Sequence, residues 1–444
     1  MSTTTTFLRN LTRKCSNDLL SASNFIVFSY LDCLDSMFCP IFKYLDEYFE
    51  GKASPCYCSN KAQLEENGVG TKESELSETL YRRKNVFRDM VNNLGFLKQF
   101  GNEETGSADS GSLLGNRWSE CGCDSCVSWM KNGDQKLHVV VREPSPKAAT
   151  KDSEVKKPVE NVIFLHGIFS SSLFWTQTVF PNLSESMRNN YRLFAFDLLG
   201  FGKSPKPRGI LYTLRDHVES IEKSLISPFQ LNSFHIVAYS MGSIIALALA
   251  AKHSKSLKSI TLIAPPYFPS KDDGASLAAL NCLAPKTIWP PKAFLTAFMS
   301  WYEHLSRCLC YIICRHHRAW EVILKLLTRR RKLPFMLTDM VQHTHHSFWH
   351  NMHNVVCGGA NFTDENIRTL IKSGAKINII IAKRDKVVPS VSGKIIMEKF
   401  PNLKVDFANA GHRSVVLKRE KEIARKLEQI WQNGRPNPYY MPEN

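Results

Sequence analysis

Residues 234–250, FHIVAYSMGSIIALALA, decide the fold. An apolar run ends at Tyr239 and passes directly through Ser240 into a small-residue, helix-forming run, with no room for a loop. A strand that turns at once into a helix places Ser240 in a sharp turn at the carboxyl edge of a sheet. The surrounding pattern is G-x-S-x-G with Ala238 in place of the first glycine. We therefore predict that Ser240 is a nucleophile.

Strand-like and helix-like runs alternate on both sides of this turn, with short connections between them. Strands are predicted over 136–142, 161–165, 192–196, 234–239, 258–263, 376–382 and 403–407, and helices over 213–226, 390–399 and 413–432. This alternation predicts an α/β fold with a mostly parallel sheet and helices on both faces. The core is expected in two parts, 134–265 and 361–434, followed by a tail over 435–444.

A serine hydroxyl attacks efficiently only when a positioned base removes its proton. On this type of sheet the expected chain order is serine, then a carboxylate, then histidine. Asp385 follows the strand 376–382, and His412 follows the strand 403–407, each in a turn. We predict that Ser240, Asp385 and His412 form a catalytic triad. This chemistry requires no cofactor, and none is expected.

Two backbone N–H groups should stabilise the oxyanion that forms during attack. The N–H of Met241 opens the helix after the nucleophile and is the first predicted donor. The second is expected in the His166-Gly167 turn after the strand 161–165, with Ile168 favoured and Phe169 as the alternative.

Residues 266–360 interrupt the alternation and are predicted to form a helical lid rich in aromatic and basic residues. The run Arg329–Lys332 is interpreted as a solvated face, although it could attract a phosphate or an anionic membrane. Four histidines recur at helical spacing, which favours packing or substrate hydrogen bonding over zinc. They are His343, His346, His350 and His353.

The N-terminal segment 1–60 resembles a signal sequence or a membrane-associated helix, because an apolar run over 19–31 follows a basic start. Asp32, Asp35, Lys43 and Asp46 interrupt the apolar residues that follow. A thin acidic stripe suits a helix lying in the membrane interface better than a lone span. A helical hairpin packed on the globular domain is the alternative.

Cysteine-bearing residues follow over 61–133, including a linker-like stretch at 101–116. Cys56 and Cys58 could carry an acyl chain, form disulfides or have no special role. With Cys121, Cys123 and Cys126 they offer five thiols, enough for zinc. Because the spacing matches no standard zinc motif, and secreted proteins more often use such thiols in disulfides, we predict no metal.

The composition of the 444-residue chain limits its functional class. It is 43% hydrophobic and 22% charged, which excludes wholesale disorder and a polytopic membrane protein. The net charge of +16 suggests an anionic partner. No aromatic and basic recognition module is present, so a membrane surface or wall polymer is favoured over nucleic acid.

Several motifs resemble one known family. HGIFSSSLFW (166–175), DLLGFGKSPKP (197–207), AYSMGS (238–243), KRDKVVP (383–389) and AGHRSVV (410–416) resemble the α/β-hydrolase superfamily. The N-terminal segment and RWSECGCDSCVSW (117–129) are similar to the plant BODYGUARD group of probable lysophospholipases. The resemblance implies a serine hydrolase of lipid acyl esters in cuticle formation, on the secretory route to the membrane or cell wall, with Cys56 or Cys58 as a lipid anchor. An acyltransferase with the same triad, or a non-catalytic receptor for a hydrophobic ligand, are the alternatives.

Overall fold

The computed structural model describes residues 2–50, 76–80, 118–130, 136–144, 159–268 and 274–432, together with Arg83, Asn85, Phe87 and Met90. Cys56, Cys58, the predicted linker 101–116 and the predicted tail 435–444 lie outside the described residues. The chain divides into two compact units. The first comprises Met1–Gly70, Glu78–Gly122 and Leu280–Arg315, and the second comprises Thr71–Ser77, Cys123–Ala279 and His316–Asn444. Both units contain part of the predicted lid, 266–360, whose boundaries stay a prediction.

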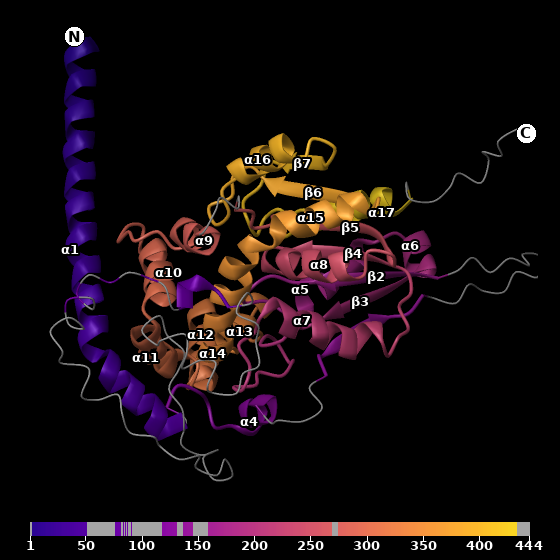
Figure 1. Ribbon diagram of the computed structural model, residues 1–444, viewed down its shortest axis with the longest axis horizontal. Helices are drawn as coiled ribbons and strands as arrows, with labels where there is room; N and C mark the ends of the chain where they lie inside the picture. The colour runs from indigo at the N-terminus through magenta and orange to yellow at the C-terminus, as the bar shows by residue number, and fades with distance from the viewer. Residues whose placement is uncertain are drawn as a thin grey trace, which may run out of the picture. The chain divides into compact units, whose positions relative to one another are not determined.

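A seven-stranded sheet forms the centre of the second unit, in the order β1-β3-β2-β4-β5-β6-β7 (Figure 1). Its strands are β1 (Val139–Arg142), β2 (Glu160–Leu165), β3 (Tyr191–Phe196), β4 (Phe234–Tyr239), β5 (Leu257–Ile263), β6 (Lys376–Ala382) and β7 (Lys404–Ala408). All neighbouring pairs are parallel except β1 and β3, which are antiparallel. Every residue of the central strand β4 is buried, as expected for a sheet covered on both faces. The predicted α/β fold is confirmed.

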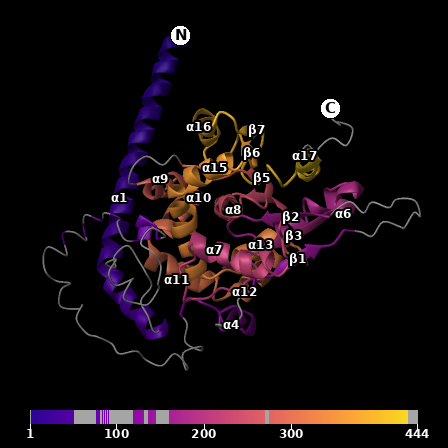
Figure 2. The ribbon, with the colours of Figure 1, turned by 45° about the vertical axis from the view of Figure 1, so that its right-hand side comes forward.

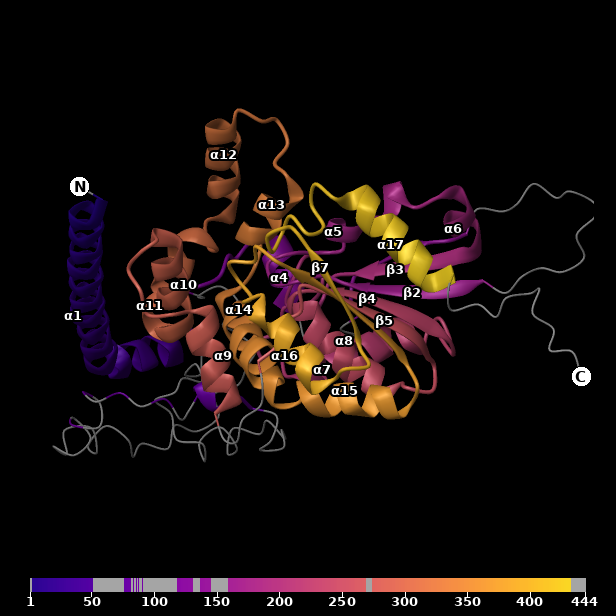
Figure 3. The ribbon, with the colours of Figure 1, turned by 90° about the horizontal axis from the view of Figure 1, so that it is seen from above.

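Helices cover both faces of this sheet. On one face, α8 (Met241–Lys252) packs between α7 (Leu214–Ile221) and α15 (Thr363–Lys372) (Figure 2). On the other lie α5 (Leu173–Thr176), α6 (Glu185–Asn190) and α17 (Glu420–Gln432) (Figure 3). The core of that second face joins Trp175 of α5 and Trp431 of α17 to Phe164 of β2. Burial of these large aromatic side chains therefore fixes α5 and α17 on this face of the sheet.

The remaining helical segments of the described residues are mostly inserted between β5 and β6. They are α9 (Ala275–Leu283), α10 (Pro291–Trp301), α11 (Glu303–Ile313), α12 (His317–Thr328), α13 (Phe335–Val341), α14 (His345–His350), the π-helix η6 (Asn351–Cys357) and the short η7 (Gly358–Asn361). Outside this insertion lie η2 (Glu78–Leu80), α4 (Asp124–Met130), η4 (Phe180–Asn182), the π-helix η5 (Glu222–Ile226) and α16 (Val391–Lys399). The expected helix over 213–226 is α7 continued by η5, and Thr213 and Asp216 form the predicted capping box.

One predicted helix, 413–432, is wrong at its start. The residues after His412 form a tight turn in which Val415 and Leu417 donate backbone hydrogen bonds to Gly411 and Arg413. Lys418 then has φ of 74°, which a helix cannot continue, and α17 begins at Glu420. The apolar residues that suggested a helix, among them Val415, are instead buried in the core and hold this turn in place.

The first unit contains α1 (Ser2–Glu50), which is one continuous helix and not the hairpin considered above. Phe28 of α1 packs against Ala297 and Tyr302 in an apolar cluster. The acidic residues of α1 find partners in the same unit. Lys286 Nζ lies 2.9 Å from Asp32 Oδ2. Arg307 Nη1 lies 3.4 Å from the fully buried Asp46 carboxylate, so the acidic stripe faces protein.

Candidate active site

Ser240 occupies the predicted sharp turn between β4 and α8. Its backbone has φ of 52° and ψ of −128°, a combination that side-chain-bearing residues rarely adopt. The Ser240 N–H donates to Ile263 O of the neighbouring strand at 2.9 Å, which holds the strained residue at the sheet edge. The turn therefore projects the hydroxyl of Ser240 away from the strand, at the carboxyl end of β4.

Close backbone packing explains the glycines around this turn. A Cβ atom on Gly242 would lie 2.4 Å from His166 O, and one on Gly167 would lie 3.0 Å from Ser240 Cβ. The turn after β2 is thus in contact with the turn after β4. Ala238 is fully buried in β4 and is accommodated there, so the departure from the G-x-S-x-G pattern leaves the turn intact.

The three predicted triad residues are brought together. Ser240 Oγ lies 2.9 Å from His412 Nε2, and His412 Nδ1 lies 2.7 Å from Asp385 Oδ2. Asp385 Oδ1 accepts the backbone N–H groups of Val387 at 2.7 Å and Val388 at 2.9 Å, which fixes the carboxylate. The side chains of Asp385 and His412 are 2% and 12% exposed, so their hydrogen bond is largely shielded from water.

Tyr239 supports the histidine, a role that the sequence interpretation missed. Its hydroxyl donates to His412 O at 3.1 Å, and its ring stacks on Phe174 at 4.7 Å. Burial raises the pKa of Tyr239, so the phenol keeps its proton and remains a donor. Because Tyr239 directly precedes Ser240 in the chain, its hydrogen bond joins the turn that carries His412 to the strand that leads into Ser240.

The turn after β2 is held by buried polar residues that were also missed. His166 Nε2 accepts the Leu198 N–H at 2.9 Å, which leaves Nδ1 as the donor to Gly167 O at 2.7 Å. Burial lowers the pKa of His166, consistent with a neutral ring. Asp197 Oδ1 accepts the Ser172 N–H at 2.6 Å. These bonds position the backbone beside Ser240, where Ile168 is the predicted oxyanion donor.

Lid helices of the second unit contact the turn that follows β2. The ring of Phe348 in α14 stacks on Phe169 at 4.6 Å. Ser171 Oγ donates to Asp339 Oδ2 of α13 at 2.8 Å. Burial raises the pKa of Asp339 to about 7, with the neighbouring Asp197 acting in the same direction and the Ser171 hydrogen bond opposing it. The lid therefore contacts the backbone segment that includes the predicted oxyanion donor.

The four predicted helical histidines do not share one regular helix. α14 begins at His345, so His343 precedes it, and the chain becomes a π-helix from Asn351, which changes the direction of later side chains. His346 Nε2 lies 2.9 Å from Ile210 O, and the His353 ring packs 4.2 Å from Trp349. These contacts agree with the packing interpretation. A separate group of residues whose side chains commonly bind metal ions lies together in the structure: Cys121, Cys123, Cys126 and His317.

Comparison with known proteins places this geometry in a family. Residues 160–418 match the model of the alpha/beta hydrolase fold family. "Probable lysophospholipase BODYGUARD 4" of Arabidopsis thaliana is 48% identical over 94% of this chain and 98% of its own length. "Probable lysophospholipase BODYGUARD 5" of the same plant is 47% identical over 95% of this chain and 97% of its own length. A solved bromoperoxidase from Bacillus anthracis is 17% identical over 67% of this chain and 96% of its own, with a TM-score of 0.45. The chain belongs to the α/β-hydrolase family and, within it, to the BODYGUARD group.

Proposed function

We propose that this chain hydrolyses a lipid acyl ester through an acyl-enzyme on Ser240. The observation that carries the proposal is the continuous hydrogen-bond chain from Asp385 through His412 to Ser240. Ser240 Oγ bonds to the acyl carbonyl carbon while its proton passes to His412 Nε2. His412 returns the proton to the leaving alcohol as the ester bond breaks. Water then attacks the acyl-enzyme by the same route and regenerates Ser240.

Asp385 and the backbone supply the remaining parts of this mechanism. The Asp385 carboxylate accepts from His412 Nδ1, which selects the tautomer with a free Nε2 and stabilises the imidazolium that forms. The N–H groups of Met241 and Ile168 are the proposed oxyanion donors. The close contact of Gly242 with His166 O supports this pairing, because it brings the turn before Ile168 against the start of α8.

The proposed substrate is a lysophospholipid or another ester with a long acyl chain. The names of the Arabidopsis relatives support this class. Ser240 is only 6% exposed, and lid residues such as Phe348 pack on the adjacent turn, so substrate entry requires the lid to move. A closed aromatic lid suits acyl chains, since it excludes water from the acyl-enzyme. The proposed setting is cuticle lipid formation, supported by the resemblance to the BODYGUARD group.

α1 supports a membrane-associated location. Residues Asn17–Phe49 are long and apolar enough to cross a membrane, a test that signal sequences and buried helices also pass. Among the α1 side chains that the structure describes, eight apolar or aromatic ones are each more than half exposed: Leu19, Phe25, Ile26, Tyr30, Met37, Ile41, Tyr44 and Tyr48. Carrying one aspartate to mid-bilayer costs about 2.5–3.5 kcal/mol. Because Asp32 and Asp46 are paired with residues of the first unit, we propose that α1 lies along a membrane with these apolar residues in the interface.

Labelling by a fluorophosphonate probe tests the nucleophile directly. The full chain in detergent should be labelled on Ser240, and Ser240→Ala should lose both labelling and turnover of lysophospholipid and p-nitrophenyl acyl esters. Ser243→Ala, the next serine of α8, should keep both. A labelled chain that does not turn over would indicate a receptor. Transfer of the acyl group to an added alcohol in preference to water would indicate an acyltransferase. Full turnover by Ser240→Ala would refute the proposal.

A further inference from the structure

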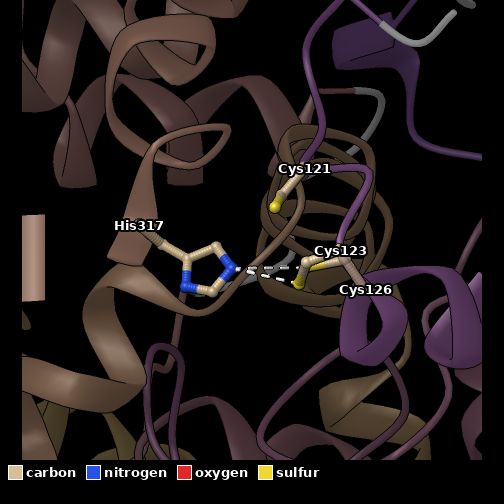
Figure 4. Close-up of side chains that lie close together, drawn as sticks. All are labelled: Cys121, Cys123, Cys126 and His317. Carbon is tan, nitrogen blue, oxygen red and sulfur yellow. Dashed lines mark hydrogen bonds between the residues drawn. The ribbon is translucent and has the colours of Figure 1, made fainter. Parts of the chain in front are cut away.

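Three thiols and one imidazole converge where α4 and α12 begin (Figure 4). The ligand atoms of Cys121, Cys123, Cys126 and His317 all lie within 4.8 Å of one another. Cys121 and Cys123 directly precede α4 and Cys126 lies in its first turn, whereas His317 is the first residue of α12, 191 residues after Cys126. We propose that this cluster is a structural zinc site of the Cys3His type.

The observed separations match those that a tetrahedral zinc ion imposes. Bonds of about 2.3 Å to sulfur and about 2.0 Å to nitrogen at the tetrahedral angle place sulfur and nitrogen about 3.5 Å apart. His317 Nε2 lies 3.5 Å from Cys126 Sγ and 3.7 Å from Cys123 Sγ. A single imidazole nitrogen has one proton or one lone pair, so it bonds to one sulfur at a time. A cation at the centre bonds to all of these atoms at once.

The chemistry of the ligands selects the metal. Thiolate sulfur favours zinc over magnesium or calcium, and three cysteines with one histidine complete a four-coordinate shell with no position left for water or substrate. This is the arrangement of a structural site and not of a catalytic one. On binding, the thiols release their protons to solvent, and the resulting thiolates hold the ion.

Residues outside the cluster lie against the segments that carry its ligands. Glu321 Oε1 accepts from Gln342 Nε2 at 2.7 Å and lies 3.7 Å from His317 Nδ1, the ring nitrogen that does not face the sulfurs, which is a charge contact and not a hydrogen bond. In zinc proteins a carboxylate that accepts from this nitrogen orients the histidine ligand. On the other side, Lys206 Nζ lies 3.6 Å from the ring centre of Trp129, and the Lys206 N–H donates to Trp129 O at 2.6 Å. These contacts, both within the second unit, hold α4, which carries Cys126, against the segment around Lys206.

The site gives the cysteine loop a structural role. The sequence predicted no metal, because the cysteine spacing matches no standard zinc motif and such thiols more often form disulfides in secreted proteins. His317, which is remote in the chain, was not part of the set considered there. Once His317 is included, zinc would join the loop before α4 to the first turn of a lid helix. The ion would close a chain segment of 191 residues between Cys126 and His317. A cross-link that closes a long chain segment stabilises the fold by lowering the conformational entropy of the unfolded chain, and this effect grows with the length of the segment.

Metal content of the purified full chain tests the proposal. The chain is isolated in detergent under reducing conditions without added chelator, and zinc is measured by inductively coupled plasma mass spectrometry. We expect about one zinc per chain, as one closed four-ligand site requires. His317→Ala and Cys126→Ser should lose it, whereas His316→Ala, which changes the exposed neighbouring histidine, and Cys282→Ser, which changes an exposed cysteine outside the cluster, should retain it.

Cobalt provides a readout that does not depend on the yield of each variant. Replacement of zinc by Co²⁺ in the full chain should give the visible absorption of a tetrahedral ion and near-ultraviolet thiolate-to-cobalt charge transfer, both absent in His317→Ala. Fluorophosphonate labelling of Ser240 in each variant reports whether the hydrolase core is folded. Zinc-free wild-type protein, full zinc retention in His317→Ala, or a disulfide among Cys121, Cys123 and Cys126 found by peptide mass spectrometry would each overturn the proposal.

Discussion

Gly242→Ala probes the contact between the two turns that flank Ser240. The added Cβ would lie 2.4 Å from His166 O and 3.1 Å from the carbonyl carbon of Leu165. Close carbon to oxygen contacts in proteins are about 3.3 Å or longer, so one of the two backbones must move by roughly 0.9 Å. A 1 Å displacement of catalytic groups can cost about 100-fold in rate. We therefore expect kcat to fall by about 100-fold through displacement of the turn that carries Ile168.

The assay distinguishes a rate lost because catalytic groups are displaced from a rate lost because the protein unfolds. The rate of p-nitrophenyl ester hydrolysis and the rate of Ser240 labelling should fall together, while the thermal unfolding midpoint drops modestly because overpacking costs about 1–3 kcal/mol. Gly209→Ala is the matched control, since its Cβ meets nothing within 4 Å. Ala238→Gly should also stay near the wild-type rate. If Gly242→Ala kept the wild-type kcat/KM, the inference that catalysis depends on close contact between the turn after β2 and the turn at Ser240 would be refuted.

Three further changes test the site and its lid. Asp385→Asn should lower kcat by about 10⁴-fold in ester hydrolysis, because the wrong histidine tautomer then faces Ser240, whereas Asp406→Asn on β7 should leave kcat unchanged. Burial raises the pKa of Asp339 from 3.8 to about 7, so its contribution to stability is complete below pH 4 and is lost as the pH rises through 7. Asp339→Asn should therefore flatten the fall in unfolding midpoint between pH 4 and 8, and an unchanged pH profile would contradict the shift. Phe348→Ala should speed fluorophosphonate labelling by removing the ring stacked on Phe169, and Phe348→Tyr, which keeps that ring, should not.

The fold and the convergence of Ser240, Asp385 and His412 could be predicted because their signals are local. The apolar run of β4 passes straight into α8, and this alone defines the turn at Ser240. Asp385 and His412 each follow an apolar strand, and parallel strands bring their carboxyl ends to one edge of the sheet. The error at 413–432 has the same origin. Apolar residues near Val415 satisfied a helical pattern, but they are buried as anchors of a turn that ends at positive φ.

The features that were missed depend on partners distant in the chain. The acidic residues of α1 were interpreted as a stripe on a helix in the membrane interface, yet Asp32 pairs with Lys286, 254 residues later. His317 carries no local sign of a ligand, because its neighbours in sequence supply no thiols and the cysteines that meet it lie near residue 120. Spacing rules describe ligands that one loop or helix presents. A site completed by a lid helix becomes visible only when packing brings that helix to the loop, so its ligand set is a property of the folded chain.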